Sequence, residues 1–97
     1  MIAHLRTYTI NKGMMDQWLN VFETDLVPLM TEHGMSVHSK WTNEARSQFI
    51  WIRVYGDSEA DLQAKEKAFY ESPWWVANVD MVRSHIAHRE VEMLHSV

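Results

Sequence analysis

The sequence contains no cysteine and very little glycine or proline, with three glycines and two prolines in 97 residues. Without cysteine the chain has no disulfide framework, no thiol nucleophile and no cysteine-based zinc site. The scarcity of glycine and proline, beside 46% hydrophobic and 23% charged residues, argues against a disordered tail or a flexible linker. We therefore expect one globular domain over residues 1–97.

Positive charge is also in short supply, because nine Lys and Arg residues stand against 13 Asp and Glu residues. A formal net charge of −4 argues against a surface built to hold nucleic acid or acidic lipid. No apolar run approaches the ~18 residues typical of a membrane span. A strand-like pattern begins already at Ile2, so we expect no leader segment. These features predict a cytoplasmic protein whose partners include neither nucleic acid nor membrane.

The sequence does contain two similar five-residue segments, HLRTY at 4–8 and WIRVY at 51–55, which we call the two phrases. Each phrase has a ring, an aliphatic residue, an arginine, a β-branched residue and a tyrosine. Alternation with a period of two is typical of a strand. The repetition predicts two similar β-α-β halves, about 1–47 and 48–97, whose first strands are these phrases.

The patterns between the phrases complete a β-α-β-β-α-β order. An apolar stripe at steps of three and four residues predicts a helix from Met15 that Pro28 kinks or shortens and that ends at His33-Gly34. Ser58 and Ser72 are expected helix caps, the second followed by Pro73 and a short helix WWVANV. The predicted strands are 2–10, 35–42, 48–55 and 85–94, and the register of the last strand stays open.

This order predicts an α+β, ferredoxin-like fold, in which a four-stranded antiparallel sheet carries both helices on one face. Strands one and three should lie side by side in its centre. Because successive side chains of a strand point to opposite faces of the sheet, the side chains of these two strands fall into two sets. The set expected beneath the helices is small and aliphatic: Ala3, Leu5, Thr7, Ile50, Ile52 and Val54. The set expected on the open face is rich in rings and arginine: His4, Arg6, Tyr8, Phe49, Trp51, Arg53 and Tyr55.

Four aromatic rings on an open face would show on the order of 600–1,000 Å². The largest apolar patch of a typical monomer is ~300–600 Å². We therefore expect a second copy of the chain to cover this face and form a homodimer. Two twisted sheets packed in this way can leave a cavity between them, which would be the natural ligand site.

Several motifs resemble the NIPSNAP family within the dimeric α+β barrel superfamily. They are Leu5-Arg6-Thr7-Tyr8, Gly13, Trp18, Pro28 and Ser72-Pro73-Trp74-Trp75. The resemblance covers about residues 2–80 and implies the same fold, together with dimerisation. It implies no particular reaction, because related barrel families include cofactor-free monooxygenases, lactone isomerases and haem-handling enzymes.

Arg6 and Arg53 are the first candidate site residues, with Tyr8 and Trp51 beside them on the same strand faces. One hypothesis is a clamp for a small carboxylate, since guanidinium offers a planar fork to two oxygens. The alternative is structural, in which the two arginines pair with acidic side chains of either subunit. The acids expected in that role are Glu44, Glu90 and Glu92.

His4 is the candidate acid or base, because it shares a strand face with Arg6 and Tyr8. It can equally be an ordinary hydrogen-bonded strand residue. His85 and His88 are three residues apart, which on a strand sends the two rings to opposite faces, so we expect no metal. No phosphate loop, dinucleotide fingerprint or hydrolase motif is present, and we expect no cofactor.

The leading functional hypothesis is a dimeric barrel that binds a small, anionic or aromatic molecule in a pocket. The alternative is a cofactor-independent monooxygenase or isomerase of a small aromatic or carbonyl compound, with His4 as its base. A remote alternative is an RNA-binding module, which would stack bases on the rings of strands one and three. Against it stand the acidic charge and the absence of a Gly-rich third strand. A purely structural subunit stays open as well.

Overall fold

The computed structural model describes residues 1–97 and contains nine elements in the predicted order. These elements are β1 (Ile2–Ile10), α1 (Met15–Val21), η1 (Phe22–Leu26), α2 (Val27–Glu32), β2 (Ser36–Thr42), β3 (Gln48–Gly56), α3 (Glu59–Tyr70), α4 (Pro73–Arg83) and β4 (Ile86–His95). None of the helices combines the length and the apolar character that crossing a membrane requires.

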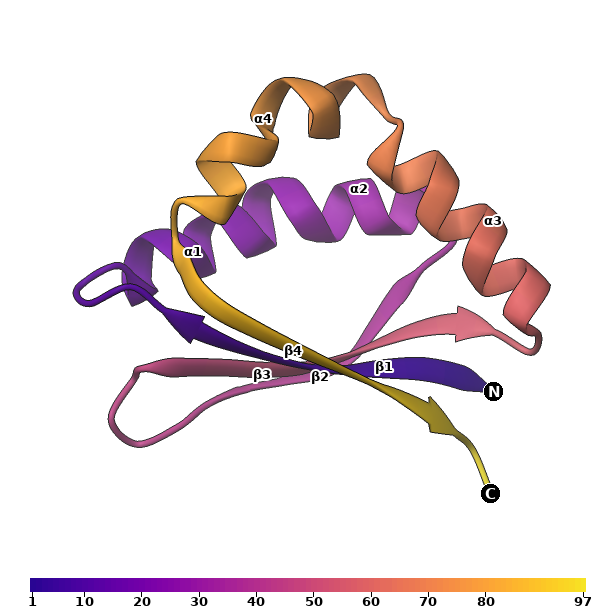
Figure 1. Cartoon of the computed structure of the whole chain (residues 1–97), viewed down its shortest axis with the longest axis horizontal. Helices are drawn as coiled ribbons and strands as arrows, with labels where there is room; N and C mark the ends of the chain where they lie inside the picture. Colours follow the sequence, from indigo (N-terminus) through magenta and orange to yellow (C-terminus); the bar gives the residue numbers. More distant parts are fainter.

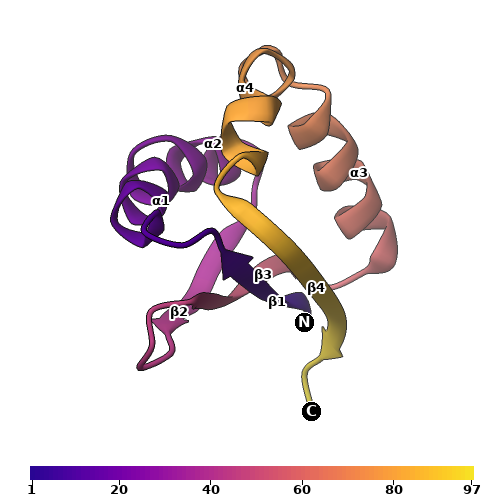
Figure 2. The same cartoon turned by 60° about the vertical axis from the view of Figure 1, so that its left-hand side comes forward.

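The four strands form one antiparallel sheet in the order β2-β3-β1-β4. All helices lie on one side of this sheet, where α1 and α2 run as one long rod and α3 and α4 form an arch (Figure 1). Seen from a second direction, β4 passes under α4 at one edge of the sheet (Figure 2). The predicted ferredoxin-like α+β fold is therefore confirmed, including the central pairing of strands one and three.

The first helical rod continues past Pro28 and does not end there. Pro28 lies in the first turn of α2, and the five residues before α2 form a π-helical turn, η1. A proline cannot donate its backbone nitrogen to the preceding turn, and a widened turn is one way for a helix to pass such a residue. The rod ends as predicted, with Gly34 at φ +77° and Met35 N donating to Met30 O at 2.9 Å.

Both predicted serine caps are present. Ser58 Oγ accepts a hydrogen bond from Asp61 N at 3.1 Å, and Ser72 Oγ accepts one from Trp75 N at 3.4 Å. The helix after Ser72 is longer than the short segment predicted, because it runs on to Arg83. That extra length brings Arg83 to the rim of the space between the helices and the sheet.

The assignment of the two strand faces was wrong. The rings and arginines lie beneath the helices, and the small aliphatic set faces outward, with only Ala3 of that set buried. The buried set on the central strands comprises His4, Arg6, Tyr8, Phe49, Trp51, Arg53 and Tyr55. The rod and the arch leave a volume above the sheet that needs large side chains to fill it. Rings also remove more apolar surface from water than valine or threonine would.

The two phrases meet in an antiparallel register that sets each arginine opposite a ring. His4 stands opposite Arg53, Leu5 opposite Ile52, and Arg6 opposite Trp51. Trp51 contacts both guanidinium groups, whose central carbons are 5.8 Å and 5.6 Å from its ring centroid. Cation–π contacts of this kind stabilise a cation that has lost its water.

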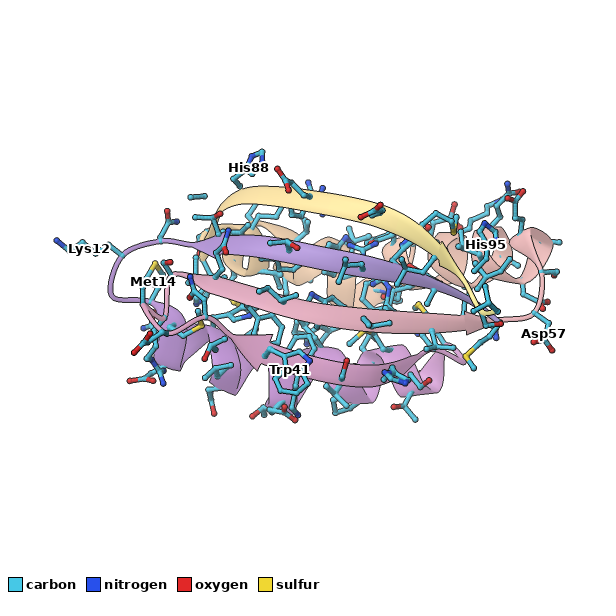
Figure 3. The ribbon with its side chains drawn as sticks, turned by 90° about the horizontal axis from the view of Figure 1, so that it is seen from below. Lys12, Met14, Trp41, Asp57, His88 and His95 are labelled. Carbon is cyan, nitrogen blue, oxygen red and sulfur yellow. The ribbon has the colours of Figure 1, made fainter.

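The other side of the sheet, which we call the open face, carries no helix (Figure 3). Its central residues are half-buried and mostly aliphatic: Leu5, Thr7, Ile50, Ile52 and Val54. Trp41 of β2 joins them with 66% of its surface exposed. The open face is thus apolar at its centre, although it lacks the rings that were expected there.

Candidate functional site

All five residues singled out from the sequence lie together beneath the helices. His4, Arg6, Tyr8, Trp51 and Arg53 are each less than a tenth exposed. The prediction that they share one face of the sheet is confirmed. Their predicted position between two sheets is wrong, because the helices of the same chain cover them. The RNA-binding alternative loses its premise for the same reason, since buried rings cannot stack on bases.

The partners of the two arginines come from α3. Glu66 Oε2 lies 3.1 Å from Arg53 Nη2 and 3.5 Å from Arg6 Nη2. The hydroxyl of Tyr70, one turn further along α3, accepts hydrogen bonds from Arg53 Nη2 at 3.0 Å and Arg6 Nη2 at 3.5 Å. We call Arg6, Arg53, Glu66 and Tyr70 the arginine cluster. The structural pairing of the arginines is thus observed, but with Glu66 and not with the acids proposed from the sequence.

The arginine cluster carries an unbalanced positive charge. Two guanidinium groups that are at most 4% exposed share one carboxylate, and that carboxylate belongs to a side chain 23% exposed. Removing a charge from water is costly unless opposite charge or hydrogen bonds replace the water. Aromatic rings supply part of the compensation, because Arg53 also lies over the rings of Tyr55 and Phe69. One full positive charge nevertheless remains without a carboxylate.

Three buried nitrogens have no hydrogen-bond partner within the protein: Arg6 Nε, Trp18 Nε1 and Trp51 Nε1. All three are donors, and no buried side-chain acceptor is left unpaired. Buried polar atoms are normally paired, with protein groups or with ordered water, so each of these donors needs an acceptor that the chain itself does not supply. A partner for these atoms must bring acceptor oxygens or nitrogens.

Two hollows adjoin the arginine cluster. The inner cavity has a volume of about 30 Å³ and lies between the sheet and the helices, with Trp18, Trp51 and Trp75 in its wall. A cavity of this size holds one or two water molecules. The outer groove, of about 360 Å³, is lined by Arg6 and Glu66 and opens toward β4. Tyr70, Arg83 and Arg89 line both hollows, and therefore stand where the two meet.

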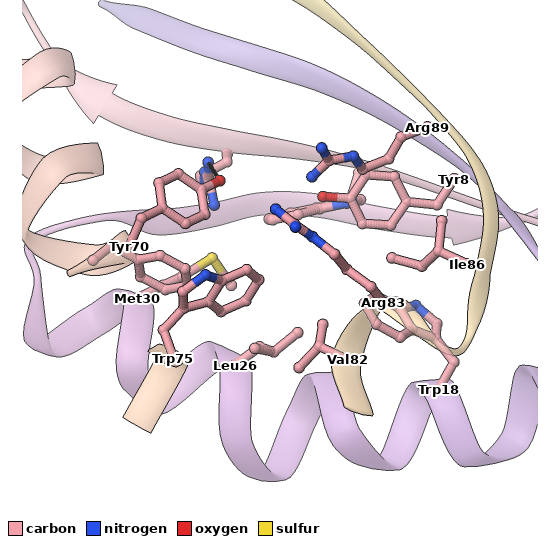
Figure 4. Close-up of a pocket in the computed structure, with 13 residues that line it drawn as sticks. Tyr8, Trp18, Leu26, Met30, Tyr70, Trp75, Val82, Arg83, Ile86 and Arg89 are labelled. Atoms are coloured by element: carbon pink, nitrogen blue, oxygen red, sulfur yellow. Dashed lines mark hydrogen bonds between the residues drawn. The ribbon is translucent and has the colours of Figure 1, made fainter. Parts of the chain in front are cut away.

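Arg83 and Arg89 bring the number of arginines around these hollows to four. Arg83 ends α4 and Arg89 lies on β4, and both side chains extend toward the ring of Tyr8 (Figure 4). No hydrogen bond or ion pair to a protein acid holds either guanidinium group. Four arginines against Glu66 alone form a site whose field attracts an anion.

His4 and Tyr55 are hydrogen-bonded to each other beside Arg53. Tyr55 O–H donates to His4 Nδ1 at 2.9 Å, while Arg53 Nε donates to the Tyr55 oxygen at 2.7 Å. Burial and the neighbouring Arg6 guanidinium lower the pKa of His4 from 6.5 to about 4. Burial raises the pKa of Tyr55. His4 is therefore neutral near pH 7, and its Nδ1 is already occupied as an acceptor.

Sequence reasoning missed Glu66, Tyr70, Arg83 and Arg89. A signal existed for the first two, because they share a helix face with the buried Leu62 and Phe69 at steps of three and four residues. An acid on an otherwise apolar helix face indicates a buried cationic partner. Arg83 and Arg89 gave no comparable signal, since they flank a turn whose geometry the sequence left open.

Comparison with known proteins identifies relatives of the whole chain. The NIPSNAP family model matches residues 3–97. Comparison with curated proteins gives no match. An uncharacterized NIPSNAP domain protein from Burkholderia xenovorans superposes with a TM-score of 0.88 at 19% identity, over 100% of this chain and 95% of that chain.

Two further solved structures are similar. Protein Atu4242 from Agrobacterium tumefaciens has a TM-score of 0.89 at 18% identity, over 100% of this chain and 94% of that chain. SnoaB, a cofactor-independent oxygenase from Streptomyces nogalater, has a TM-score of 0.75 at 11% identity, over 98% of this chain and 91% of that chain. At such identities these likenesses establish a shared fold.

Proposed function

The chain belongs to the NIPSNAP family, and on that premise we propose that it binds a small organic anion in the hollows beside its arginine cluster. The observation that carries this proposal is the charge imbalance. Arg6, Arg53, Arg83 and Arg89 line the hollows, and Glu66 is the one carboxylate among them. An anion that displaces water there gains charge-assisted hydrogen bonds.

The body of the ligand is expected to be apolar or aromatic. Ten of the 13 residues around the inner cavity are hydrophobic, among them Trp51, Phe69 and Trp75. The cavity itself is small, so a ring can enter only from the outer groove and after Arg83, an exposed side chain where the two hollows meet, has shifted. The polar end then stays in the groove, against Arg83 and Arg89. A carboxylate attached to an aromatic ring fits both requirements.

Phenylacetate and its uncharged analogue phenylacetamide test this proposal. Binding is measured by titration calorimetry and by quenching of tryptophan fluorescence, since three tryptophans line the inner cavity. We expect phenylacetate to bind and phenylacetamide to bind at least about tenfold more weakly, because the charged hydrogen bonds contribute about 1.5–3 kcal/mol. Equal affinity for both compounds, or binding of neither, contradicts the proposal.

Arg83→Gln and Arg89→Gln are the matching variants, because both side chains are exposed and their loss should leave the fold intact. Each is expected to weaken phenylacetate binding by about tenfold. Arg46→Gln is the control, since Arg46 is also exposed but pairs with Asp16 away from the hollows. A loss of affinity in Arg46→Gln as large as in Arg83→Gln would indicate a general charge effect and no defined site.

We also infer that a second copy of the chain covers the open face. The four strands have 9, 7, 9 and 10 residues, and at ~3.3 Å per residue and ~4.8 Å between strands they span on the order of 550 Å² before side-chain relief is counted. A standard interface buries ~800 Å² per partner, which is comparable. Leu5, Ile50 and Ile52 supply an apolar centre, and Glu90 and Glu92 of β4 a polar rim.

Light scattering after size-exclusion chromatography measures the oligomeric state directly. The protein is expected to have the mass of a dimer, and Ile52→Arg that of a monomer. Gln63→Arg adds the same charge to exposed α3 and serves as the control. A monomeric mass for the unmodified protein at micromolar concentration contradicts the inference.

A further inference from the structure

The hydroxyl of Tyr70 differs from every other polar group of the site. Its oxygen accepts from two cationic donors, Arg53 Nη2 at 3.0 Å and Arg6 Nη2 at 3.5 Å. No protein acceptor takes the proton of the same hydroxyl. Since Tyr70 lines both the inner cavity and the outer groove, this proton is available to a molecule bound in either.

The other two tyrosines lack this combination. Tyr55 donates to His4 Nδ1 and accepts from Arg53 Nε, so both of its hydrogen-bonding functions are taken, and it lines neither hollow. Tyr8 accepts from one arginine only, through Arg6 Nη1 at 3.0 Å, and does not reach the groove. Tyr70 is thus the one tyrosine with two cationic donors and access to bound ligand.

The charges around Tyr70 come from five elements. Arg6 of β1 and Arg53 of β3 bond it directly, Glu66 lies one turn away on α3, and Arg83 of α4 and Arg89 of β4 line the same hollows. Burial alone would raise the pKa of Tyr70, but the charges of Arg53 and Arg6 outweigh it and lower that pKa below its ordinary value. The surroundings thus stabilise a phenolate.

From this geometry we infer that Tyr70 is a proton-transfer residue for a bound keto carboxylate, and this inference rests on the proposed anion site. The phenolate oxygen of Tyr70 takes the proton from the carbon beside the ketone. The electron pair of that C–H bond moves to the carbonyl oxygen and forms an enolate. The neutral Tyr70 then returns the proton to oxygen or to carbon, which gives the enol or regenerates the ketone. No oxidant, metal or second substrate is consumed.

The remaining features suit this chemistry. The carboxylate of the ligand is held by Arg83 and Arg89, as argued above. Arg6 Nε and Trp51 Nε1 are buried donors without a protein partner. Arg6 lines the outer groove and Trp51 the inner cavity, so each donor can stabilise a developing negative charge only on an oxygen in its own hollow. His4 is not suited to the role, because its pKa is lowered to about 4 and its Nδ1 is already occupied.

The first experiment titrates the tyrosines by the ultraviolet absorbance of tyrosinate. The sequence has three tyrosines, so each contributes a third of the change. We expect one of them to ionise below the ordinary tyrosine pKa, and this phase to disappear in Tyr70→Phe but persist in Tyr55→Phe. If all three ionise at or above the ordinary value, the inference is overturned. The measurement on the unmodified protein does not depend on any variant folding.

The second experiment follows the exchange of the methylene protons of phenylpyruvate with deuterium oxide by proton NMR. We expect the protein to accelerate exchange above the buffer rate, and Tyr70→Phe to reduce this acceleration about a hundredfold, within the range of general acid–base catalysis. Phenylpyruvate affinity, measured in parallel by calorimetry, should change by less than about threefold. Glu71→Gln, an exposed neighbour outside the hollows, is the control for α3 and should leave the exchange rate unchanged.

The outcomes separate the two proposals. If phenylpyruvate binds and is not exchanged, or if Tyr70→Phe exchanges it as fast as the unmodified protein, the anion site stands and the role of Tyr70 is refuted. If neither phenylpyruvate nor phenylacetate binds, both proposals fail, whereas binding of phenylacetate alone leaves the anion site standing and refutes the role of Tyr70. The methyl ester of phenylpyruvate, which lacks the charge, should be exchanged at the buffer rate. Equal acceleration of the ester would show that the arginines do not hold the substrate.

Discussion

The two faces of the sheet are made from alternate residues of the same strands, yet they differ in almost every property. The face under the helices holds rings, arginines and a histidine that are all but fully buried. The open face holds valine, isoleucine and threonine that remain half-exposed. Polarity did not decide which set went inside. What decided it was the volume beneath the helical arch, together with the availability of Glu66 and Tyr70 as partners for the charges.

The largest expected effect on stability is the loss of a buried ring on β3. It is measured by comparing Phe49 with its neighbour Ile50, whose side chain points to the opposite face. Phe49→Ala removes a ring that is 1% exposed, and we expect a loss of about 3–5 kcal/mol in the free energy of unfolding. Ile50→Ala, on the open face, should cost less than half as much in the dilute protein. Urea denaturation of both variants measures the difference. Equal losses would mean that the two faces are equally buried in solution.

A smaller loss is expected when the counter-charge of the arginine cluster is removed. Glu66→Gln leaves Arg6 and Arg53 without a carboxylate, and we expect a loss of about 2–3 kcal/mol, because Glu66 keeps some contact with water that screens the interaction. The same denaturation assay applies, with the exposed Glu71→Gln as control. A Glu66→Gln variant as stable as the unmodified protein would show that the arginines are compensated by other groups.

The smallest of the three effects is a dependence of stability on pH. The pKa of His4 is about 4 in the folded chain and near 6.5 in the unfolded chain, so the unfolded state binds a proton first as the pH falls. Stability from this group is full above pH 6.5 and is lost progressively down to pH 4. Between pH 7 and about pH 5.5 we expect a loss of about 1 kcal/mol.

His4→Gln should flatten that dependence, because glutamine keeps an acceptor for Tyr55 and does not titrate. His38→Gln, on the exposed β2 strand, provides the comparison. The measurement is the free energy of unfolding at several pH values for the three proteins. A dependence that persists unchanged in His4→Gln would place its origin in other groups.

Much of the fold could be predicted from the chain, because its signals are local. The period-two phrases, the apolar stripe of the first helix and the serine caps at Ser58 and Ser72 each depend on residues close in sequence. Only part of the candidate site could be predicted. Parity correctly grouped His4, Arg6 and Arg53 on one face, but parity carries no information about which face the helices cover. The partners Glu66 and Tyr70 approach from another element, and only packing of α3 on the sheet brings them to the arginines.

The register of the two phrases has one more consequence. Because Leu5 faces Ile52 while His4 faces Arg53 and Arg6 faces Trp51, a local two-fold axis passes between Leu5 and Ile52. Rotation about that axis exchanges Arg6 with Arg53. The two strands alone would therefore allow a bound molecule two equivalent orientations. Glu66 and Tyr70 have no counterparts from the first half of the chain in the cluster. The asymmetry that lets the site tell one side of a flat substrate from the other therefore comes from the second half of the chain, through Glu66 and Tyr70 of α3 and through Arg83 and Arg89, which line the same hollows.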